Sequence, residues 1–503
     1  MKDGRSWTAG WLYVTTFVTG AAVMALEMAA SRFLAPYFGT SLPVWANLIG
    51  LILIALSAGY YAGGRLADRL PDGRVLANVV VAGGIFASLV PLAGQGIFRF
   101  MASGITDTPV PQVVASFVAI LLVFFPPVFL LAFVSPFAIR LATLDIAKSG
   151  QVAGNLYAFS TLGSITGTFV PAFVTIPFIG TRETILIASV LLIAAGALGP
   201  GRRARLLWLF LPLAVYLAGP PVVKPVPGLL YERETPYQFV QVVTQGSYRY
   251  LIVNEGGGIQ SVYNAGGILT GMYYDYYLPL PLLRTGQDKK VLVLGSAGGT
   301  ILRQYYTVLA NRYHLDLTGV EIDPVVAALG PLYFGLDPDQ VHVVVADARP
   351  WLAASRASYD IIIVDAYSHQ MYIPFQLTTR EFFASVKQHL RPGGLVALNV
   401  NAVSPDSSLL LAIERTVAAV FPYTYQVPVP GSYNYVVIGT DLPVDAAALR
   451  ALDGSSVANV ARTFAAGLVP VGRTQGLVLT DNRAPVEFLT DQMIWQVLPG
   501  GRP

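Results

Sequence analysis

The chain has no cysteine and few charged residues. Only four of its 503 residues are histidines, and all four lie in the second half: His314, His342, His369 and His389. Disulfides, thiolate zinc sites and cysteine nucleophiles are therefore excluded, and so is a histidine-based metal site in the first half. Charged residues make up 12% of the chain, against about 25% in an average soluble domain. A large part of the chain is therefore expected to lie in a solvent other than water.

The two halves of the chain differ in charge. Residues 1–219 hold 13 Lys and Arg against 7 Asp and Glu, whereas the remainder holds 19 against 22. The acidic second half shows no basic stripe, which argues against nucleic-acid binding. No spacing of possible ligands indicates a metal site.

Long apolar runs fill the first 219 residues. A bilayer core about 30 Å thick needs about 20 apolar residues per helix. Such runs lie at 11–35, 44–64, 77–98, 112–139, 154–179, 184–199 and 206–222. They predict a polytopic α-helical domain with about seven spans, and hence a multi-pass protein of the cell membrane in contact with the lipid bilayer.

Two groups of residues inside these runs are unusual. Glu27 and Arg32 each cost about 2.5 to 3.5 kcal/mol at membrane depth, so they should face the interior of the bundle, as a polar pocket or as an internal ion pair. A stretch of small residues is better explained by close helix packing than by a transport path. It consists of Gly154, Gly163, Ser164, Gly167 and Thr168.

From residue 289 the pattern changes to short apolar runs that alternate with helical stretches. The runs lie at 289–295, 315–323, 341–347, 359–365 and 395–400. Fully apolar strands separated by helices predict a parallel sheet covered on both faces, in an α/β Rossmann-like domain. We therefore predict four parts: a transmembrane domain at 1–219, a Pro-rich linker at 220–230, a small β subdomain with an aromatic segment at 231–285, and the Rossmann-like domain at 286–503.

Glycine and carboxylate residues stand where the predicted strands end. In open α/β sheets ligands bind at the carboxyl ends of the strands. The turn from Gly295 through Gly298 to Gly299 lets the backbone approach a ligand at a helix N-terminus. Glu321 can accept from both ribose hydroxyls, and Asp347, followed by Ala348, can accept from an adenine amine. Each position alone could be an ordinary turn or cap, but their order on successive strands predicts a nucleoside site.

The chain resembles the membrane-fused form of the spermidine synthase (polyamine aminopropyltransferase) family. The resemblance rests on these strand ends and on the segments ALEMAASRFLAPYFGTS, GYYAGGRLADR, VSPFAIRLA and LTDNRAPVEFL. It implies a methyltransferase-type Rossmann fold preceded by a small N-terminal β-hairpin subdomain. It also implies decarboxylated S-adenosylmethionine as co-substrate with no tightly bound cofactor, a small-molecule amine as acceptor, and a homodimer.

The resemblance also implies roles for individual residues. Asp365, at the end of YDIIIVD, would orient the attacking ammonium and take its proton. Gln238 would contact the donor, and Gln260 the acceptor. The aromatic segment GMYYDYYLPLPLL corresponds to the gate of the amine pocket. The acceptor side would therefore comprise Gln260, Tyr273, Tyr274, Asp275, Tyr367 and Ser368.

Three positions depart from the family pattern. Gly298 stands where an aspartate helps to bind the donor's amine, Ser368 stands where a second aspartate holds the far amine of the acceptor, and Tyr274 and Asp275 replace histidine and glutamate of the gate. Fewer carboxylates weaken the case for a diamine. Two alternatives to aminopropyl transfer stay open. One is another S-adenosylmethionine-dependent transferase, of methyl or aminocarboxypropyl groups, acting on a membrane-associated acceptor. The other is a transporter or sensor with a regulatory nucleotide-binding domain.

The distribution of Lys and Arg bears on orientation. They cluster at the N-terminus and near Arg69, Arg140 and Arg203, which the positive-inside bias makes cytoplasmic. Seven spans would then leave the C-terminal domain outside, away from its expected co-substrate. A cytoplasmic C-terminal domain requires one of two changes to this count. Either one of the weaker runs does not cross the membrane, or the run at 112–139, interrupted at Pro126 and Pro127, forms two segments. We predict a catalytic domain on the cytoplasmic side.

Overall fold

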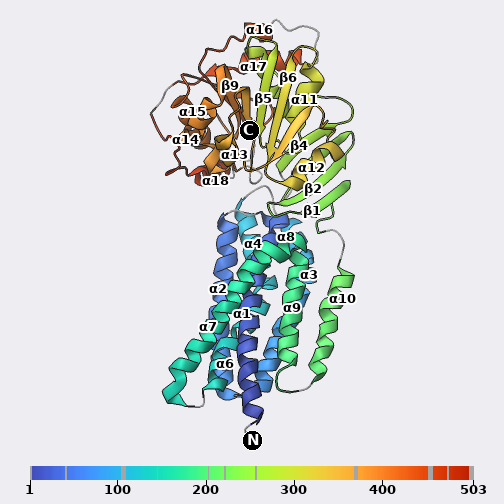
Figure 1. Cartoon of the computed structure of the whole chain (residues 1–503), viewed down its shortest axis with the longest axis vertical. Helices are drawn as coiled ribbons and strands as arrows, with labels where there is room; N and C mark the ends of the chain where they lie inside the picture. The colour runs from blue at the N-terminus through green and yellow to red at the C-terminus, as the bar shows by residue number, and fades with distance from the viewer. Residues whose placement is uncertain are drawn as a thin grey trace. The chain divides into compact units, whose positions relative to one another are not determined.

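The computed structural model divides into two compact units, Met1–Lys224 and Pro225–Pro503, each described by itself (Figure 1). The described residues are 3–39, 42–103, 109–143, 145–201, 203–219, 223–254, 258–367, 372–450, 457–472 and 475–497.

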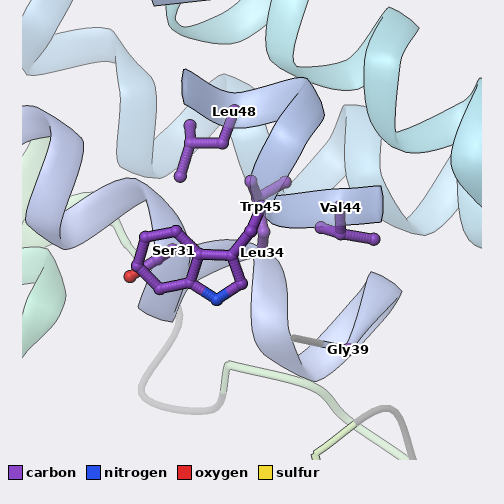
Figure 2. A pocket seen from close by; sticks show the side chains of 6 residues that line it. All are labelled: Ser31, Leu34, Gly39, Val44, Trp45 and Leu48. Carbon is purple, nitrogen blue, oxygen red and sulfur yellow. The ribbon is translucent and has the colours of Figure 1, made fainter. Parts of the chain in front are cut away.

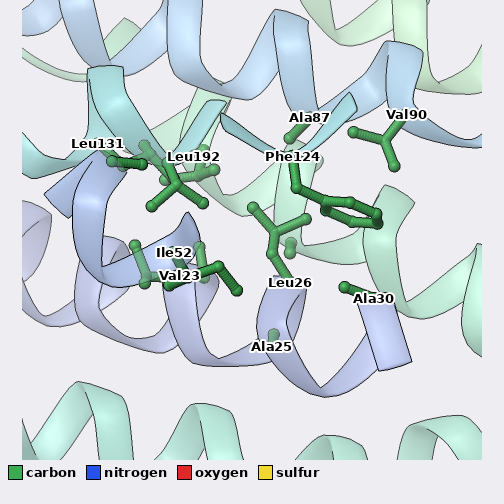
Figure 3. Close-up of a cluster of buried hydrophobic side chains, with 14 of the residues drawn as sticks. Val23, Ala25, Leu26, Ala30, Ile52, Ala87, Val90, Phe124, Leu131 and Leu192 are labelled. Carbon is green, nitrogen blue, oxygen red and sulfur yellow. The ribbon is translucent and has the colours of Figure 1, made fainter. Parts of the chain in front are cut away.

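The first unit is built entirely from helices within its described residues. The α-helices are α1 (Asp3–Phe38), α2 (Leu42–Arg69), α3 (Gly73–Ser103), α4 (Pro109–Val123), α5 (Phe125–Ala132), α6 (Val134–Ala142), α7 (Ser149–Val170), α8 (Ile176–Phe178), α9 (Thr181–Ala197) and α10 (Phe210–Ala218). Short 3-10 segments η1 (Ile146–Lys148) and η3 (Arg203–Leu209) and a π-helical turn η2 (Pro171–Thr175) join them. Leucine, phenylalanine and valine side chains from α1, α3, α9 and the residue between α4 and α5 meet in one buried cluster (Figure 3).

The number of long helices is smaller than predicted. In the described part of the chain, five helical segments are long and apolar enough to cross a membrane: Gly10–Phe38, Pro43–Arg69, Gly73–Ala102, Phe125–Ala142 and Ile146–Phe178. The predicted runs at 184–199 and 206–222 fall on α9, with 17 residues, and on α10, with 9. The first five predicted runs therefore lie on these long segments, and the last two lie on the shorter helices α9 and α10.

The run at 112–139 forms one interrupted pass. Pro126 and Pro127 occupy the first turn of α5, where a proline needs no hydrogen-bond partner for its nitrogen. Along this pass, Val113 accepts from Asn47 of α2, and Arg140 pairs with Asp68 further along α2. The contacts join residue 47 to residue 113 and residue 68 to residue 140, so α4 to α6 run parallel to α2. The alternative of two separate segments is therefore wrong.

Helices α1 and α7 are in backbone contact. A Cβ added at Gly163 would lie 2.0 Å from the carbonyl oxygen of Phe17, and one at Gly167 would lie 2.0 Å from that of Ala21. Only glycine permits such an approach. The prediction of close packing is confirmed for these two residues and is wrong for Gly154, where a Cβ would meet nothing within 4 Å.

The helical unit has two distinct ends. At one end, Gly73 lies against Pro200 and Trp11, and Arg205 donates to Asn78. At the other end, residues 223 and 224 are held to the last turn of α1. Lys224 Nζ donates to the carbonyl of Pro36 at 2.6 Å, and the Tyr37 hydroxyl donates to that of Val223 at 2.8 Å. The chain therefore leaves this unit at the end opposite to its basic connections.

A small cavity lies where α1 turns into α2. It is lined by Ser31, Leu34, Gly39, Val44, Trp45 and Leu48 (Figure 2). Its lining is apolar except for Ser31, whose hydroxyl is bonded to the carbonyl of Met28. Glu27 and Arg32 are each half-buried on α1. The cavity offers no titratable group for chemistry.

The second unit begins with a small antiparallel sheet. Its strands pair in the order β1 (Leu229–Glu234), β2 (Phe239–Gln245), β3 (Tyr248–Val253) and β4 (Gly258–Asn264). Alternate side chains of β2 and β3 pack on Phe334 and Leu329. Gln238 directly precedes β2, and Gln260 lies on β4.

The larger sheet has eight strands in the order β12-β10-β11-β9-β8-β5-β6-β7. Their bounds are β5 (Asp288–Leu294), β6 (His314–Glu321), β7 (Val341–Val345), β8 (Tyr359–Val364), β9 (Leu390–Asn401), β10 (Tyr423–Pro428), β11 (Asn434–Thr440) and β12 (Val469–Pro470). The five predicted strands, β5 to β9, are all present and pair in parallel. Strands β10 to β12 pair antiparallel and were not predicted.

Short 3-10 segments and α-helices connect these strands. They are η4 (Tyr273–Tyr277), η5 (Leu280–Leu283), α11 (Thr300–Leu309), α12 (Pro324–Tyr333), α13 (Ala348–Ala354), η6 (Phe375–Leu377), α14 (Arg380–Gln388), α15 (Ser408–Ala418), α16 (Ala447–Arg450), α17 (Ala458–Gly467) and α18 (Val486–Val497). The chain proceeds from β5 outward through β6 to β7, then returns to add β8 on the other side of β5. The carboxyl ends of β5 and β8 therefore meet at the switch point where such sheets bind ligands.

Candidate active site

The switch point brings Gly295 against Asp365. Gly295 follows β5 with φ +85°, and a Cβ there would lie 2.5 Å from the Asp365 carbonyl oxygen. The Asp365 amide in turn donates to Leu294 at 2.9 Å. A side chain at position 295 would therefore push the ends of the two strands apart, and with them Asp365.

Asp365 is a buried carboxylate with two side-chain donors. The Tyr273 hydroxyl donates to its Oδ2 at 3.0 Å, and Asn399 Nδ2 donates to its Oδ1 at 3.3 Å. Burial raises the pKa of the Asp365 carboxyl to about 7, while these two hydrogen bonds act in the opposite direction. Asp365 is therefore poised to exchange a proton near neutral pH, as a general base requires.

Tyrosines surround this carboxylate. The rings of Tyr273 and Tyr274 lie 4.1 Å apart, and that of Tyr277 meets Tyr273 edge-on at 6.3 Å. Tyr274 donates to the Ile259 carbonyl and Tyr367 to the Asn399 carbonyl. Burial, followed by the charge of Asp365, raises the pKa of the hydroxyls of Tyr273, Tyr274, Tyr277 and Tyr367, so these groups stay neutral. The result is one acidic group in an aromatic setting, which suits a cationic amine.

The glycine turn after β5 is organised by Glu321. The carboxylate of Glu321 accepts from the amides of Ala297 and Asp323, at 2.9 and 3.0 Å. Burial raises the pKa of Glu321 to about 7, against the effect of these amides. Ala297 has φ +45° and Gly299 has φ +86° at the start of α11. An ionised carboxylate has about four acceptor sites on its two oxygens, so Glu321 can accept from a ligand as well as from the loop.

The remaining donor-side residues lie around this turn. Gln238 donates to Asp323 at 3.5 Å, beside a shorter bond from Thr235 to the same oxygen. Asp347 caps α13 by accepting from the Arg349 amide and is otherwise exposed, with Ala348 as the first residue of that helix. Asp347 thus serves as an ordinary helix cap, which was the alternative to a ligand-binding role.

Gly298 is closely packed. Its amide donates to Ser261 at 2.8 Å, and a Cβ there would lie 2.9 Å from the Phe334 ring. The space that an aspartate would need at this position is therefore filled by the small sheet and by the residue after α12.

Asp275 is occupied by its own loop. Its oxygens accept from the Thr270 amide and hydroxyl, from the Gly271 amide and from Gln304. Asp275 therefore holds the segment before η4 in place, and its position at the entry to the amine pocket stays a prediction. Gln260 is half-buried on β4. Ser368 lies outside the described residues.

Sequence reasoning missed three residues at this site. Asn399 contacts Asp365 directly, Asn434 contacts Asn399, and the Tyr277 hydroxyl is fully buried without a hydrogen-bond partner among the described residues. One signal was available: Asn399 lies within the apolar run LVALNV and Asn401 directly follows it, so two amides lie on a single face near the carboxyl end of this strand.

The chain is similar in sequence to known proteins. Residues 272–441 match the spermine/spermidine synthase domain. A probable polyamine aminopropyl transferase of Bifidobacterium longum is 40% identical over 198 residues, which are 39% of this chain and 42% of that protein. A polyamine aminopropyltransferase of Mycobacterium tuberculosis is 29% identical over 377 residues, which are 68% of this chain and 70% of that protein.

The second of these alignments is longer than the C-terminal unit, so it extends into the helical unit. Among solved structures, a probable spermidine synthase from Corynebacterium glutamicum matches with 21% identity and a TM-score of 0.38, over 50% of this chain and 100% of that chain. The resemblance predicted from the sequence is confirmed, and the C-terminal part of this chain contains a spermine/spermidine synthase domain.

Proposed function

We propose that the chain is a polyamine aminopropyltransferase that transfers an aminopropyl group from decarboxylated S-adenosylmethionine to an amine. The observation that carries the proposal is Asp365, a buried carboxylate with a pKa near 7 at the switch point of the sheet. The domain match and the names of the two relatives support the same transferase class.

The proposed donor would lie across the carboxyl ends of the strands. Asp347, Glu321 and Gly295 end β7, β6 and β5 in spatial order, with Asp365 ending β8 beyond them. An adenine at Asp347 and a ribose at Glu321 would direct the sulfonium toward Asp365. Gln238 would contact the donor from the small sheet.

The proposed reaction is a displacement at carbon. Asp365 takes a proton from the acceptor's ammonium, whose free pKa is about 10. The amine nitrogen then forms a bond to the methylene carbon beside the sulfonium. The C–S bond breaks, and its electron pair stays on sulfur, which leaves as a neutral thioether. Tyr273, Tyr274 and Tyr367 hold the cation by their rings, and Gln260 and Ser368 belong to the proposed acceptor side.

The test of this proposal is mass spectrometry of the products. Purified full-length protein is incubated with the donor and a panel of amines, and the Asp365→Asn variant is run beside it. We expect a mass gain of one aminopropyl group on an amine. In the variant we expect turnover to fall by about 10² to 10⁴-fold, which is the usual contribution of a general base. Unchanged turnover in the variant would overturn the assignment of Asp365.

One observation bears on the choice of donor. The packed position of Gly298 leaves no side chain there to bind the donor's amine. Another S-adenosylmethionine-dependent transfer, of methyl or aminocarboxypropyl, is therefore tested in the same assay. Calorimetric titration with the two donors separates the possibilities, and clear preference for the carboxylated donor would contradict aminopropyl transfer.

The proposal includes a location. The five apolar segments suggest insertion of the helical unit into a membrane. Because the donor is expected in the cytoplasm, we propose that the C-terminal unit faces that side. Contact with the lipid bilayer and the homodimer implied by the family resemblance belong to the same proposal.

A further inference from the structure

Three asparagines form a chain of hydrogen bonds that ends on Asp365. Asn399 and Asn401 lie two residues apart on β9, so their side chains share one face of the sheet. Asn434 begins β11, where it pairs directly with Asn401. Asn434 Nδ2 donates to Asn399 Oδ1 at 3.0 Å and to Asn401 Oδ1 at 2.8 Å. Asn399 Nδ2 donates to Asp365 Oδ1 at 3.3 Å.

The chemistry of the groups determines the direction of this chain. An ionised carboxylate only accepts hydrogen bonds, whereas an amide group donates at nitrogen and accepts at oxygen. Asn399 can favour the ionised form of Asp365 only while its nitrogen faces that residue. Its oxygen then faces Asn434, which must offer nitrogen in return. Asn399 is 1% exposed, so water cannot replace these partners.

We propose that Asn434 is a positioning residue: it fixes the direction of the Asn399 amide, so that Asn399 presents a hydrogen-bond donor to Asp365. In the described part of the chain, the Asn434 side chain donates to Asn399 and Asn401 and not to Asp365, so it acts through Asn399. The proposal rests on the proposed function in treating Asp365 as the base. It goes beyond that function in assigning a role to a residue in the antiparallel part of the sheet.

The other groups that face Asp365 lie on different elements. Tyr273, Tyr274 and Tyr277 come from η4, and Tyr367 comes from the loop after β8. These hydroxyls are held neutral by burial, so a change at position 434 on β11 leaves their charge unaltered. The asparagine chain can therefore be perturbed separately.

The decisive variant is Asn434→Asp. A carboxylate at position 434 accepts the nitrogen of Asn399, so that amide turns and presents its oxygen to Asp365. Asp365 then loses a donor and faces an acceptor, which disfavours its ionised form. We expect the acid limb of the kcat/KM profile to move upward by about one pH unit or more. Activity lost near neutral pH should return at higher pH.

Asn401→Asp is the matched comparison. It adds the same charge to the same chain, but position 401 already accepts from Asn434, so the direction of the chain is kept. We expect a clearly smaller shift of the acid limb than in Asn434→Asp. A merely structural role for Asn434 would lower activity at every pH without moving the limb.

A second measurement makes the result independent of turnover. Infrared difference spectra of the full-length protein, recorded as a function of pH, follow the carboxyl band that Asp365→Asn removes. The proposal is supported if Asp365 titrates about one unit higher in Asn434→Asp than in Asn401→Asp, and it is overturned if the two titrate together. If the wild type transfers no aminopropyl group to any amine, the proposed function fails, while the infrared titration still decides the role of Asn434.

Discussion

Glycine brings backbones together in both units, with different consequences. In the helical unit, Gly163 and Gly167 let α7 touch the backbone of α1, and the contact joins two apolar helices. In the sheet, Gly295 lets the end of β5 touch the end of β8, and the contact positions the carboxylate of Asp365. The residue type is the same, and the neighbouring polar groups decide whether the contact only packs the fold or also builds a site.

The largest expected effect is all-or-none and concerns the two ends of the helical unit. Residue 224 lies at the end opposite to the basic connections. The positive-inside bias would place the basic connections in the cytoplasm, whereas a cytoplasmic catalytic unit would place them outside. The absence of cysteine permits single-cysteine labelling at exposed positions: Ile146→Cys at the basic end and Leu332→Cys in the C-terminal unit. We expect an impermeant maleimide added to intact cells to label the first and spare the second.

The reverse labelling would follow the charge bias and place the C-terminal unit outside the cytoplasm. Labelling after permeabilisation serves as the control for access. Protection of both positions in intact cells would contradict the finding that residue 224 and the basic connections lie at opposite ends of the helical unit.

The helical half of the comparison is tested by Gly163→Ala. The added Cβ has no space beside the Phe17 carbonyl, so α1 and α7 must separate, at a cost of about 3 kcal/mol or more. We expect loss of monodisperse protein in detergent on size-exclusion chromatography. Gly154→Ala on the same helix meets nothing within 4 Å and should behave as wild type. Equal behaviour of the two variants would refute the backbone contact.

The site half is tested by Gly295→Ala. The methyl group would displace Asp365, and misplacement of a reacting group by about 1 Å can cost about 10²-fold in rate. We therefore expect kcat/KM to fall about 10²-fold while the chain stays folded. Gly286→Ala is the matched control, because Gly286 also has a positive φ, +92°, but has open space around it. It should cost about 1 kcal/mol of stability and leave kcat/KM unchanged.

The sequence predicted the parts of the site that depend on local signals. Gly295, Glu321 and Asp365 were found because each ends an apolar strand, and strand ends converge in any parallel sheet. Asn434 could not be found in this way, because its partner Asn399 is 35 positions away, across an antiparallel pairing that the pattern does not show. The loop role of Asp275 depends on Gln304, a residue of another helix. Contacts between distant elements require the order of the strands, which apolar runs alone do not determine.

The smallest expected effect is on the free energy of unfolding, to which a buried site carboxylate and a packed core contribute with opposite sign. Asp365 has its pKa raised from 3.8 to about 7 in the folded chain, so the folded state binds this proton more tightly than the unfolded state. Its contribution to stability therefore falls as pH rises from about 4 to about 7. At pH 8, Asp365→Asn removes the cost of a buried charge, and we expect the free energy of unfolding to rise by about 1 to 4 kcal/mol.

At pH 4 the same substitution should bring no such gain, since Asp365 is then protonated when folded and close to half-protonated when unfolded. Denaturant unfolding of the full-length protein in detergent at both pH values measures the difference. Asp316→Asn, at an exposed ion pair with Lys290, serves as the control and should change stability by about 0.5 kcal/mol or less at either pH. A variant at position 365 that is less stable than the wild type at pH 8 would show that the hydrogen bonds from Tyr273 and Asn399 outweigh the cost of burial. Asp365 would then stabilise the fold, as the glycine contacts of the helical unit do, and its burial would carry no cost in stability.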